Sequence, residues 1–289
     1  MENKCIILVP SCDAYADLWP TFLHGVKKYW SDCPFELYLG ANELRCEEDG
    51  VRGIGSNEGL VWSSRLRDFL GQVECTHVLL MLEDFILRKP VATAEIMDAL
   101  TVCTENQLDC LRLVPRPAPC NRPDGKEKYG RIEPGEIYRF STQAAIWRKE
   151  FLLQILQPGL SIWQFELGAK DPEFEVGAKV WGVYTPLLPY EGIFTHHVVE
   201  KGKWLPHELW ILRRKRFPIT EGGRPTIGIW ELAAYQAGEY FTRLTQQLFG
   251  RNATKWRNRS KKMVPRFVLN QYDKLRGRAG NVAKAPPSQ

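Results

Sequence analysis

The sequence predicts an α/β fold, a sandwich in which helices cover both faces of a mostly parallel central sheet. Up to about residue 190, short apolar runs alternate with segments whose apolar residues recur at helical spacing. Two of the apolar runs, 5–10 and 77–82, lead directly into polar residues. Such alternation is typical of a parallel sheet with crossover helices, and no internal repeat points to another architecture.

The first half of the pattern contains three strands and three helices. The strands are continuous apolar runs bounded by polar or glycine-containing turns. Leu18, Trp19 and Phe22 begin the helical spacing of the first helix, and Ser56 or Asn57 is a candidate N-cap for the second. The expected strands are 5–10, 35–39 and 77–82, and the expected helices are 17–30, 60–70 and 94–103.

The second half follows the same two patterns after a long loop. Residues 115–135 are rich in proline, glycine and charge, which predicts an irregular connection. Beyond residue 189 the character changes, with paired histidines and then a run of arginines and lysines. The expected strands are 110–114, 138–147 and 180–185, and the expected helices are 150–156, 163–176 and 229–248.

The net charge of +5 conceals an uneven distribution. Residues 250–289 hold 11 of the 39 Lys and Arg but a single acid, Asp273, and so carry +10. The remaining 28 basic and 33 acidic side chains give the rest of the chain −5. A segment this basic is attracted to phosphate groups, either of lipids or of nucleic acid.

Several protein classes do not fit the sequence. No apolar stretch approaches the roughly 20 residues of a membrane helix, and the run 5–10 is too short for a signal peptide, so we expect a cytoplasmic protein. The eight cysteines contain no Cys-x-x-Cys pair, which predicts reduced thiols rather than a zinc site or a disulfide framework. No Gly-x-Gly-x-x-Gly follows the first strand, which argues against a nicotinamide dehydrogenase.

The most informative residues are Glu83 and Asp84, which directly follow the apolar run 77–82. Ligands of open α/β sheets bind beyond the carboxyl ends of the strands. Burying two carboxylates there without a partner is costly. Mg²⁺ or Mn²⁺ bridging a carboxylate to a diphosphate is the natural partner, because both ions prefer hard oxygen ligands. The alternative is a solvated strand end or a helix N-cap.

This run resembles the strand and acidic motif of GT-A-type glycosyltransferases. The segments Val9–Trp19, Trp62–Ser63 and Val78–Leu87 are similar to those of bacterial glycosyltransferase-like proteins from capsule and O-antigen gene clusters. The resemblance covers roughly residues 5–205. It implies a GT-A-like nucleotide-binding domain that uses a nucleoside-diphosphate sugar and a divalent metal. Glu83–Asp84 departs from the usual Asp-x-Asp motif, because no residue separates the two acids.

The resemblance and the change of character along the chain together predict three parts. Residues 1–205 would form the GT-A-like catalytic domain, and residues 206–278 a helical, basic appendage. Residues 279–289 are small and polar, which is typical of a disordered tail.

The resemblance assigns the loop after the first strand to the nucleotide. Ser11 and Asp13 would reach the base or the ribose, since a carboxylate accepts hydrogen bonds from ribose hydroxyls or a pyrimidine N–H. The alternative is a turn that only caps the following helix. Asn57, Trp62 and Arg65 would line the same cleft, with core packing as the alternative role of Trp62.

The resemblance makes Asp84 a metal ligand and Glu83 a donor-binding residue. A histidine late in a GT-A domain often completes the metal shell. His196 and His197 would face opposite ways in a strand, so at most one is a ligand, and we favour His197. Lys203 would reach the diphosphate and stabilise the leaving group. Zinc is not expected, because no third ligand lies at a useful spacing.

The segment 161–166 offers a general base. In inverting GT-A-type transferases, a carboxylate that opens a late helix accepts the proton of the attacking hydroxyl, and Glu166 matches this placement. Trp163 would form a stacking platform for the sugar. The alternatives for the base are the acids that follow, namely Asp171, Glu173 and Glu175.

The basic C-terminal segment carries Trp256, Val264, Phe267 and Leu275 at roughly helical intervals among Lys and Arg. This pattern is typical of a helix that lies on an anionic membrane surface, and Pro265 would divide it into two short helices. The alternative is a solvated tail without a partner. A nucleic-acid partner is not expected, because the tail has no reading motif and the rest of the chain is acidic.

Together these observations predict a glycosyltransferase of cell-surface polysaccharide synthesis. It would move a sugar from a nucleoside-diphosphate sugar to a saccharide acceptor carried on a lipid, with inversion and with help from Mn²⁺ or Mg²⁺. It would lie against the inner face of the cytoplasmic membrane. The alternative, motivated by the imperfect acidic motif, is a non-catalytic GT-A-like scaffold subunit of a polysaccharide assembly.

Overall fold

The computed structural model describes residues 4–56, 61–119, 126–136, 138–168, 172–189, 197–220 and 224–233. The chain divides into two compact units: Met1–Val199 with Trp204–Pro225, and Glu200–Lys203 with Thr226–Gln289. The first unit therefore extends past residue 205, where the sequence places the end of the catalytic domain. The expected membrane-surface helices and the tail 279–289 lie outside the described residues.

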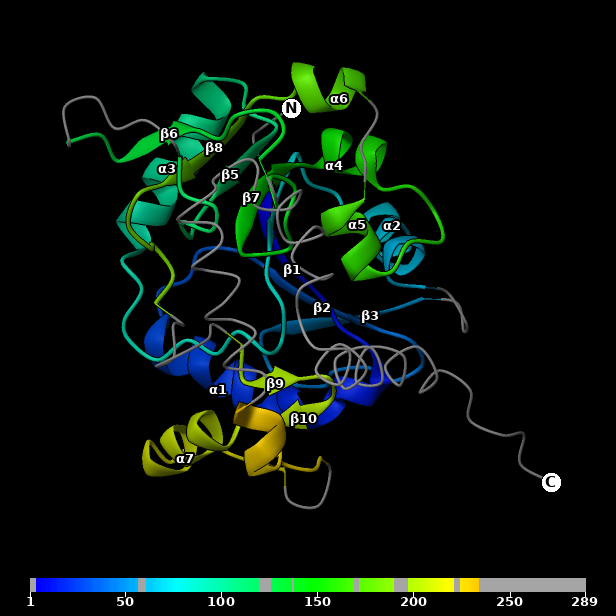
Figure 1. The fold of residues 1–289 in the computed structure, drawn as a ribbon, viewed down its shortest axis with the longest axis vertical. Helices are drawn as coiled ribbons and strands as arrows, with labels where there is room; N and C mark the ends of the chain where they lie inside the picture. Colours follow the sequence, from blue (N-terminus) through cyan, green and yellow to red (C-terminus); the bar gives the residue numbers. More distant parts are fainter. Residues whose placement is uncertain are drawn as a thin grey trace, which may run out of the picture. The chain divides into compact units, whose positions relative to one another are not determined.

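An eight-stranded sheet with the order β3-β2-β1-β4-β7-β5-β8-β6 forms the centre of the first unit (Figure 1). Strands β3, β2, β1 and β4 run parallel, β7 is antiparallel to both of its neighbours, and β6 is antiparallel to β8. The mostly parallel α/β sandwich predicted from the sequence is therefore confirmed. The strands are β1 (Cys5–Pro10), β2 (Leu37–Ala41), β3 (Val51–Gly55), β4 (His77–Leu80), β5 (Cys110–Arg112), β6 (Tyr129–Arg131), β7 (Ala145–Arg148) and β8 (Val180–Val183). A separate two-stranded sheet pairs β9 (Val199–Glu200) with β10 (Lys203–Trp204).

The sheet separates two hydrophobic cores because side chains alternate along each strand. On fully buried β1, Ile7 and Val9 join one core, and Ile6 and Leu8 join the other. The two helical layers that cover these faces are visible in Figure 1. The first core contains α1 (Trp19–Tyr29), α3 (Thr93–Glu105) and α7 (Pro206–Arg214), and the second contains α2 (Trp62–Gln72), α4 (Lys149–Ile155) and α5 (Ile162–Leu167).

Two helical segments differ from the sequence prediction. The single helix expected at 163–176 is two helices, α5 and α6 (Pro172–Gly177), because α5 ends at Gly168 in an extended conformation. A Cβ at Gly168 would lie 2.3 Å from the Gln164 carbonyl oxygen, so only glycine fits this stop. Helix α7 lies at the start of the segment 206–278, which the sequence predicts to be helical and basic, although the individual helix was not delimited there. Asp13–Leu18, before α1, is a 3₁₀ helix.

The strands differ from the prediction at three places. The expected strand 138–147 is regular only in β7, and β6 lies inside the expected loop 115–135. Strand β3 was not predicted, because Gly53 and Gly55 interrupt its apolar pattern. A Cβ at Gly53 would lie 2.7 Å from the carbonyl oxygen of Cys46, so glycine here permits close backbone packing.

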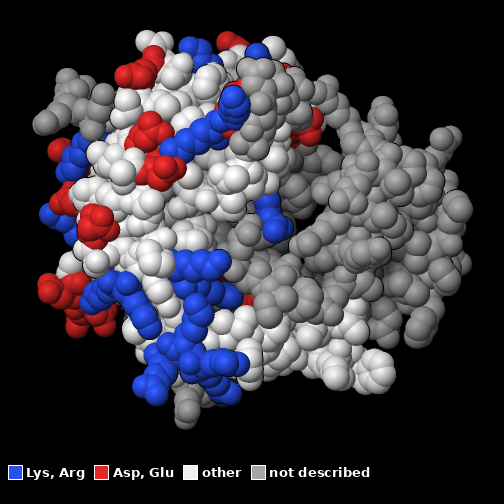
Figure 2. Space-filling model, turned by 90° about the vertical axis from the view of Figure 1, so that its left-hand side faces the viewer, with Lys and Arg blue, Asp and Glu red and all other residues white. Residues whose placement is uncertain are grey.

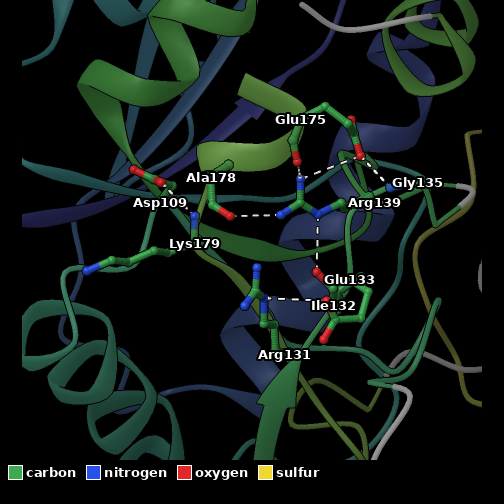
Figure 3. A network of polar contacts seen from close by, with 9 residues as sticks. All are labelled: Asp109, Arg131, Ile132, Glu133, Gly135, Arg139, Glu175, Ala178 and Lys179. Atoms are coloured by element: carbon green, nitrogen blue, oxygen red, sulfur yellow. Dashed lines mark hydrogen bonds and ion pairs between the residues drawn. The ribbon is translucent and has the colours of Figure 1, made fainter. Parts of the chain in front are cut away.

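The buried guanidinium of Arg139 organises the irregular segment before β7 (Figure 3). Its Nη2 donates to the Ala178 carbonyl at 2.7 Å, its Nε donates to the Ile132 carbonyl at 3.2 Å, and its Nη1 donates to the Glu175 carbonyl. The Glu175 carboxylate accepts the Gly135 N–H at 2.8 Å. Glu175, which the sequence offers as an alternative general base, is thus part of a structural hydrogen-bond network.

Among the described residues, no helix is both long enough and apolar enough to cross a membrane. The same part of the chain contains seven cysteines, and none of the seven is joined in a disulfide.

Helix α7, which belongs to the first unit, is attached to the segment after β4 by a buried ion pair between Arg88 and Glu208. Their side chains are 5% and 0% exposed. Burial alone would raise the pKa of Glu208, but His207 and Arg88 outweigh it and lower that pKa. The Arg88 carbonyl accepts a further bond from Lys215 Nζ at 2.9 Å. The segment that follows Glu83 and Asp84 is therefore tied to α7.

We expect Arg88→Met to lower the free energy of unfolding by about 3–5 kcal/mol, because it leaves the Glu208 carboxylate buried without its cation. Chemical denaturation measures this loss. Lys27→Met is the matched control, since it breaks an exposed 2.8 Å pair with Glu48 and should cost less than about 1 kcal/mol. Equal losses in the two variants would contradict the assigned role of the buried pair.

Candidate functional site

The order of strands reverses between β1 and β4. The chain places β2 and β3 on one side of β1 and then crosses to β4 on the other. Both strands are parallel, with Leu8 opposite Leu80, so their carboxyl ends open at the same edge of the sheet. The Met81 N–H continues the ladder to the Leu8 carbonyl at 3.1 Å. Open α/β sheets bind their ligands at such a switch point.

The acidic pair lies in the turn that follows β4 at this edge. Glu83 is 7% exposed and Asp84 is half-buried. Desolvation by burial, followed by the charge of Asp84, raises the pKa of Glu83 to about 8, against a smaller opposing effect of Ser11 and Arg224. The fold therefore places two carboxyl groups side by side and disfavours the ionisation of Glu83 at neutral pH.

Ser11, at the end of β1, belongs to the same site. It is 2% exposed, and its Oγ accepts the indole N–H of Trp19 at 2.9 Å. A hydrogen bond with Ser11 lowers the pKa of Glu83, which places the hydroxyl beside that carboxylate. Cys12 follows, and burial together with the charge of Glu83 raises the pKa of its thiol. The structure thus joins Ser11 to the acidic pair. A contact of Ser11 with a nucleotide stays a prediction.

Asp13 is engaged with the loop that follows β2. Its Oδ1 accepts the N–H of Asn42 at 2.9 Å and of Leu44 at 3.3 Å, and its Oδ2 accepts the N–H of Glu43 at 3.1 Å. Asp13 therefore fixes two loops of the switch-point edge against each other. The predicted contact with ribose or base stays a prediction, and it would have to share these oxygens.

Arg224 was not identified from the sequence, although it lies beside the site. Its Nε and Nη2 bind the two carboxylate oxygens of Asp17 at 3.1 and 2.8 Å, and its guanidinium stacks 4.3 Å from the Tyr15 ring centre. Its charge lowers the pKa of Glu83. Burial and Asp84 raise the pKa of Tyr15 to about 12. No local pattern signals this contact, because the partners lie 207 residues apart.

Helix α2 contributes the second side of the site. Arg65 is close enough to Cys12 for its charge to oppose the rise in the thiol pKa. Trp62, one turn earlier, is half-buried and packs on Phe165 of α5, with ring centres 5.3 Å apart. Trp62 therefore packs against the second core, and Arg65 lies near the loop after β1. A contact of either residue with a nucleotide stays a prediction.

Glu166 of α5 lies at the same edge of the sheet as the acidic pair. Its Oε1 accepts both the N–H and the hydroxyl of Thr142, at 2.6 and 2.7 Å. Thr142 precedes β7, which is antiparallel to β4 with Ala145 opposite Leu80. The residues that precede β7, including Thr142, therefore lie at the same edge of the sheet as the residues that follow β4.

Trp163 is 60% exposed, on the outer side of α5. It lines an open surface depression together with neighbouring residues of the same segment. The other lining residues are Gln157, Leu160, Gln164, Leu167 and Gly168. Its proposed role as a sugar platform stays a prediction.

His197 is distant from the acidic turn in the sequence but lies close to it in the fold. Its ring centre lies 6.5 Å from that of Phe85, and the next residue, Val198, donates its N–H to the Asp84 carbonyl at 2.9 Å. Within the described ranges, no three His, Cys, Asp or Glu side chains converge as a ready-made metal site. The donor types still fit Mg²⁺ or Mn²⁺, because Glu83 and Asp84 are adjacent carboxyl groups, whose oxygens are the hard ligands that both ions prefer.

Asn57 is outside the described residues, as is His196. Lys203 belongs to the second unit, where its Nζ binds the Glu231 carboxylate at 2.8 Å. A contact of Lys203 with a diphosphate stays a prediction that requires this ion pair to open.

No protein-family model matches the chain, and no curated protein matches it. Among solved structures it is similar to S. aureus TarS in complex with UDP-GlcNAc, at 18% identity and a TM-score of 0.40. This similarity covers 62% of the chain and only 56% of the TarS chain. A Leptospira borgpetersenii cytidylyltransferase is 12% identical at a TM-score of 0.40, over 78% of this chain and 99% of that one.

The high pKa of Glu83 predicts how the stability of the metal-free protein depends on pH. Between the ordinary carboxyl value of 4.5 and about 8, the unfolded chain releases a proton that folded Glu83 retains. Stability contributed by this group is therefore present at low pH and is lost as the pH rises through about 8.

We expect Glu83→Gln to flatten this decline when unfolding is followed by denaturant titration between pH 5 and 8 in the presence of a chelator. Glu150→Gln, a change at an 83%-exposed carboxylate, should leave it unchanged. A decline of the same slope in wild-type and Glu83→Gln protein would show that Glu83 is not the titrating group.

Proposed function

We propose that this protein is a glycosyltransferase that moves a sugar from a nucleoside-diphosphate sugar to a saccharide acceptor. The observation that carries the proposal is the acidic pair at the switch point between β1 and β4, formed by buried Glu83 and half-buried Asp84. A crevice at that point accepts a nucleotide in open α/β sheets. Carboxylates facing a diphosphate need a cation between them, which makes a metal-assisted diphosphate leaving group the fitting chemistry.

In this proposal Asp84, with His197 from the neighbouring segment, holds a Mg²⁺ or Mn²⁺ ion. The ion, when bound, neutralises charge that develops on the departing diphosphate. Glu83 supports it from the buried side, through its contact with Ser11. The loop after β1 and residue Arg65 of α2 would hold the nucleotide. Lys203 would add a second positive charge to the leaving group.

The chemical step we propose is a direct displacement. The acceptor hydroxyl oxygen bonds to the anomeric carbon as the bond from that carbon to the diphosphate oxygen breaks, and the nucleoside diphosphate departs. Glu166 takes the hydroxyl proton, a contribution of roughly 10²–10⁴-fold for a well-placed general base. Its place beside Thr142 supports this role, because Thr142 lies at the same sheet edge as the acidic pair. Displacement from the opposite side inverts the anomeric centre.

The acceptor we propose is a saccharide carried on a lipid, in the synthesis of a cell-surface polysaccharide at the inner face of the cytoplasmic membrane. The excess of +10 on residues 250–289 supports this location, since basic segments are attracted to anionic lipid. Trp163 would contact the saccharide from the open depression on α5.

A donor screen tests the activity. Purified protein is incubated with UDP-, GDP-, dTDP- and CMP-sugars, with Mn²⁺ or with a chelator, and nucleotide release is measured. We expect Mn²⁺-dependent release from one donor and a fall of roughly 100-fold or more in Asp84→Asn, because that change removes charge from the metal position.

Asp98→Asn is the matched control, since it alters an exposed aspartate that pairs with Lys128 on the surface. It should release nucleotide at the wild-type rate. Undiminished release by Asp84→Asn would exclude the metal role of this residue. Absence of both nucleotide binding and release, with lipid-linked acceptor supplied, would favour the non-catalytic scaffold.

A further inference from the structure

The solvent-facing side of α7 is both aromatic and strongly basic. Leu209 and Leu212 face the core, and the opposite side exposes Trp210, which is 58% exposed. Arg213 and Arg214, in the last turn, are exposed, and so is Arg216 just beyond the helix. The Arg214 guanidinium lies 5.4 Å from the centre of the Trp210 ring.

Further cations extend this surface onto neighbouring elements. Lys215 Nζ lies 5.7 Å from the Tyr29 ring centre, and Lys28 Nζ lies 5.5 Å from the same ring and 5.9 Å from that of Phe217. Figure 2 shows Lys and Arg side chains gathered in the lower part of this face, at the level of α1 and α7 in Figure 1. We call this group the α7 basic surface; it consists of Lys28, Trp210, Arg213, Arg214, Lys215 and Arg216.

The positive charge of this surface is not balanced by acids. Glu208, the acid of α7, is fully buried and paired with Arg88. Within the part of the chain that the structure describes, Lys28, Arg213, Arg214 and Arg216 form no ion pair with an acid. Lys27 differs, because it is paired with Glu48 at 2.8 Å. The surface therefore offers unneutralised cations around an exposed indole.

We propose that the α7 basic surface docks the folded first unit onto an anionic membrane. Lys and Arg are attracted to the acidic lipid headgroups, and a tryptophan beside them inserts its apolar ring at the level of the headgroups while its N–H stays hydrated. The surface consists of residues of the first unit and includes none of the basic residues 250–289, so it would hold the first unit itself on the membrane. This proposal does not depend on transferase activity.

A membrane fits this surface better than a nucleic acid does. A duplex is bound by basic residues along a groove or a helix that enters it, and single strands need a series of stacking platforms. Here one indole stands among five cations. The other two aromatic residues, Tyr29 and Phe217, lie next to the lysines and are half-buried and buried, respectively. A single amphipathic anchor within a positive field is typical of interfacial helices.

Co-sedimentation of the full-length chain with vesicles tests the proposal. We expect binding to phosphatidylcholine vesicles that contain phosphatidylglycerol and not to phosphatidylcholine alone. Arg213→Gln with Arg214→Gln should weaken the partition roughly 30-fold, at about 1 kcal/mol for each basic residue. Trp210→Ser should weaken it further, with a loss that persists at high salt because it is not electrostatic.

The matched control combines Arg131→Gln with Lys179→Gln, two exposed cations at the β6 and β8 end of the sheet. It removes the same charge and should bind vesicles like the wild type. Thermal melting confirms that each variant is folded. Equal partition of the wild type and the arginine variant would overturn the proposal. The proposal would also be overturned if the arginine variant lost binding to a mixed-sequence single-stranded RNA but bound vesicles as well as the wild type does.

Discussion

Two carboxyl groups lie side by side at the end of a buried strand, and their mutual repulsion determines which groups can lie around them. Burial and the charge of Asp84 raise the pKa of Glu83 to about 8, so the fold itself disfavours full ionisation of the pair. Such an arrangement is costly unless a cation relieves it, and strained electrostatics of this kind gather at functional sites.

Segments that are distant in the sequence contact the acidic pair or the residues beside it. Arg224 returns to Asp17 and Tyr15 next to the pair, and Val198 bonds to the backbone of Asp84. Arg88, a few residues after the pair, is fixed by Glu208 of α7. The same helix exposes its basic side to solvent. The element that stabilises the acidic turn therefore also carries the surface that we propose to meet the membrane.

The sequence predicted what local patterns determine, and it missed what depends on tertiary contact. The apolar run of β1 and the acidic end of β4 were evident, and both lie at the switch point. Arg224 could not be found, because only the folded chain brings it beside Tyr15. Strand β3 was not predicted because Gly53 has a low strand propensity. The structure shows that glycine is needed there for close backbone packing. Asp13 resembled a nucleotide ligand, but its type and position suit a loop cap equally well.

Mn²⁺ binding to the full-length protein, followed by electron paramagnetic resonance with and without a nucleoside diphosphate, tests the central claim most directly. Because linkage between two ligands is reciprocal, each should tighten the binding of the other if they meet at the acidic pair. We predict that wild-type protein shows this mutual effect and that Asp84→Ala abolishes it. Unchanged Mn²⁺ binding in Asp84→Ala, with the same dependence on the nucleotide, would contradict the claim.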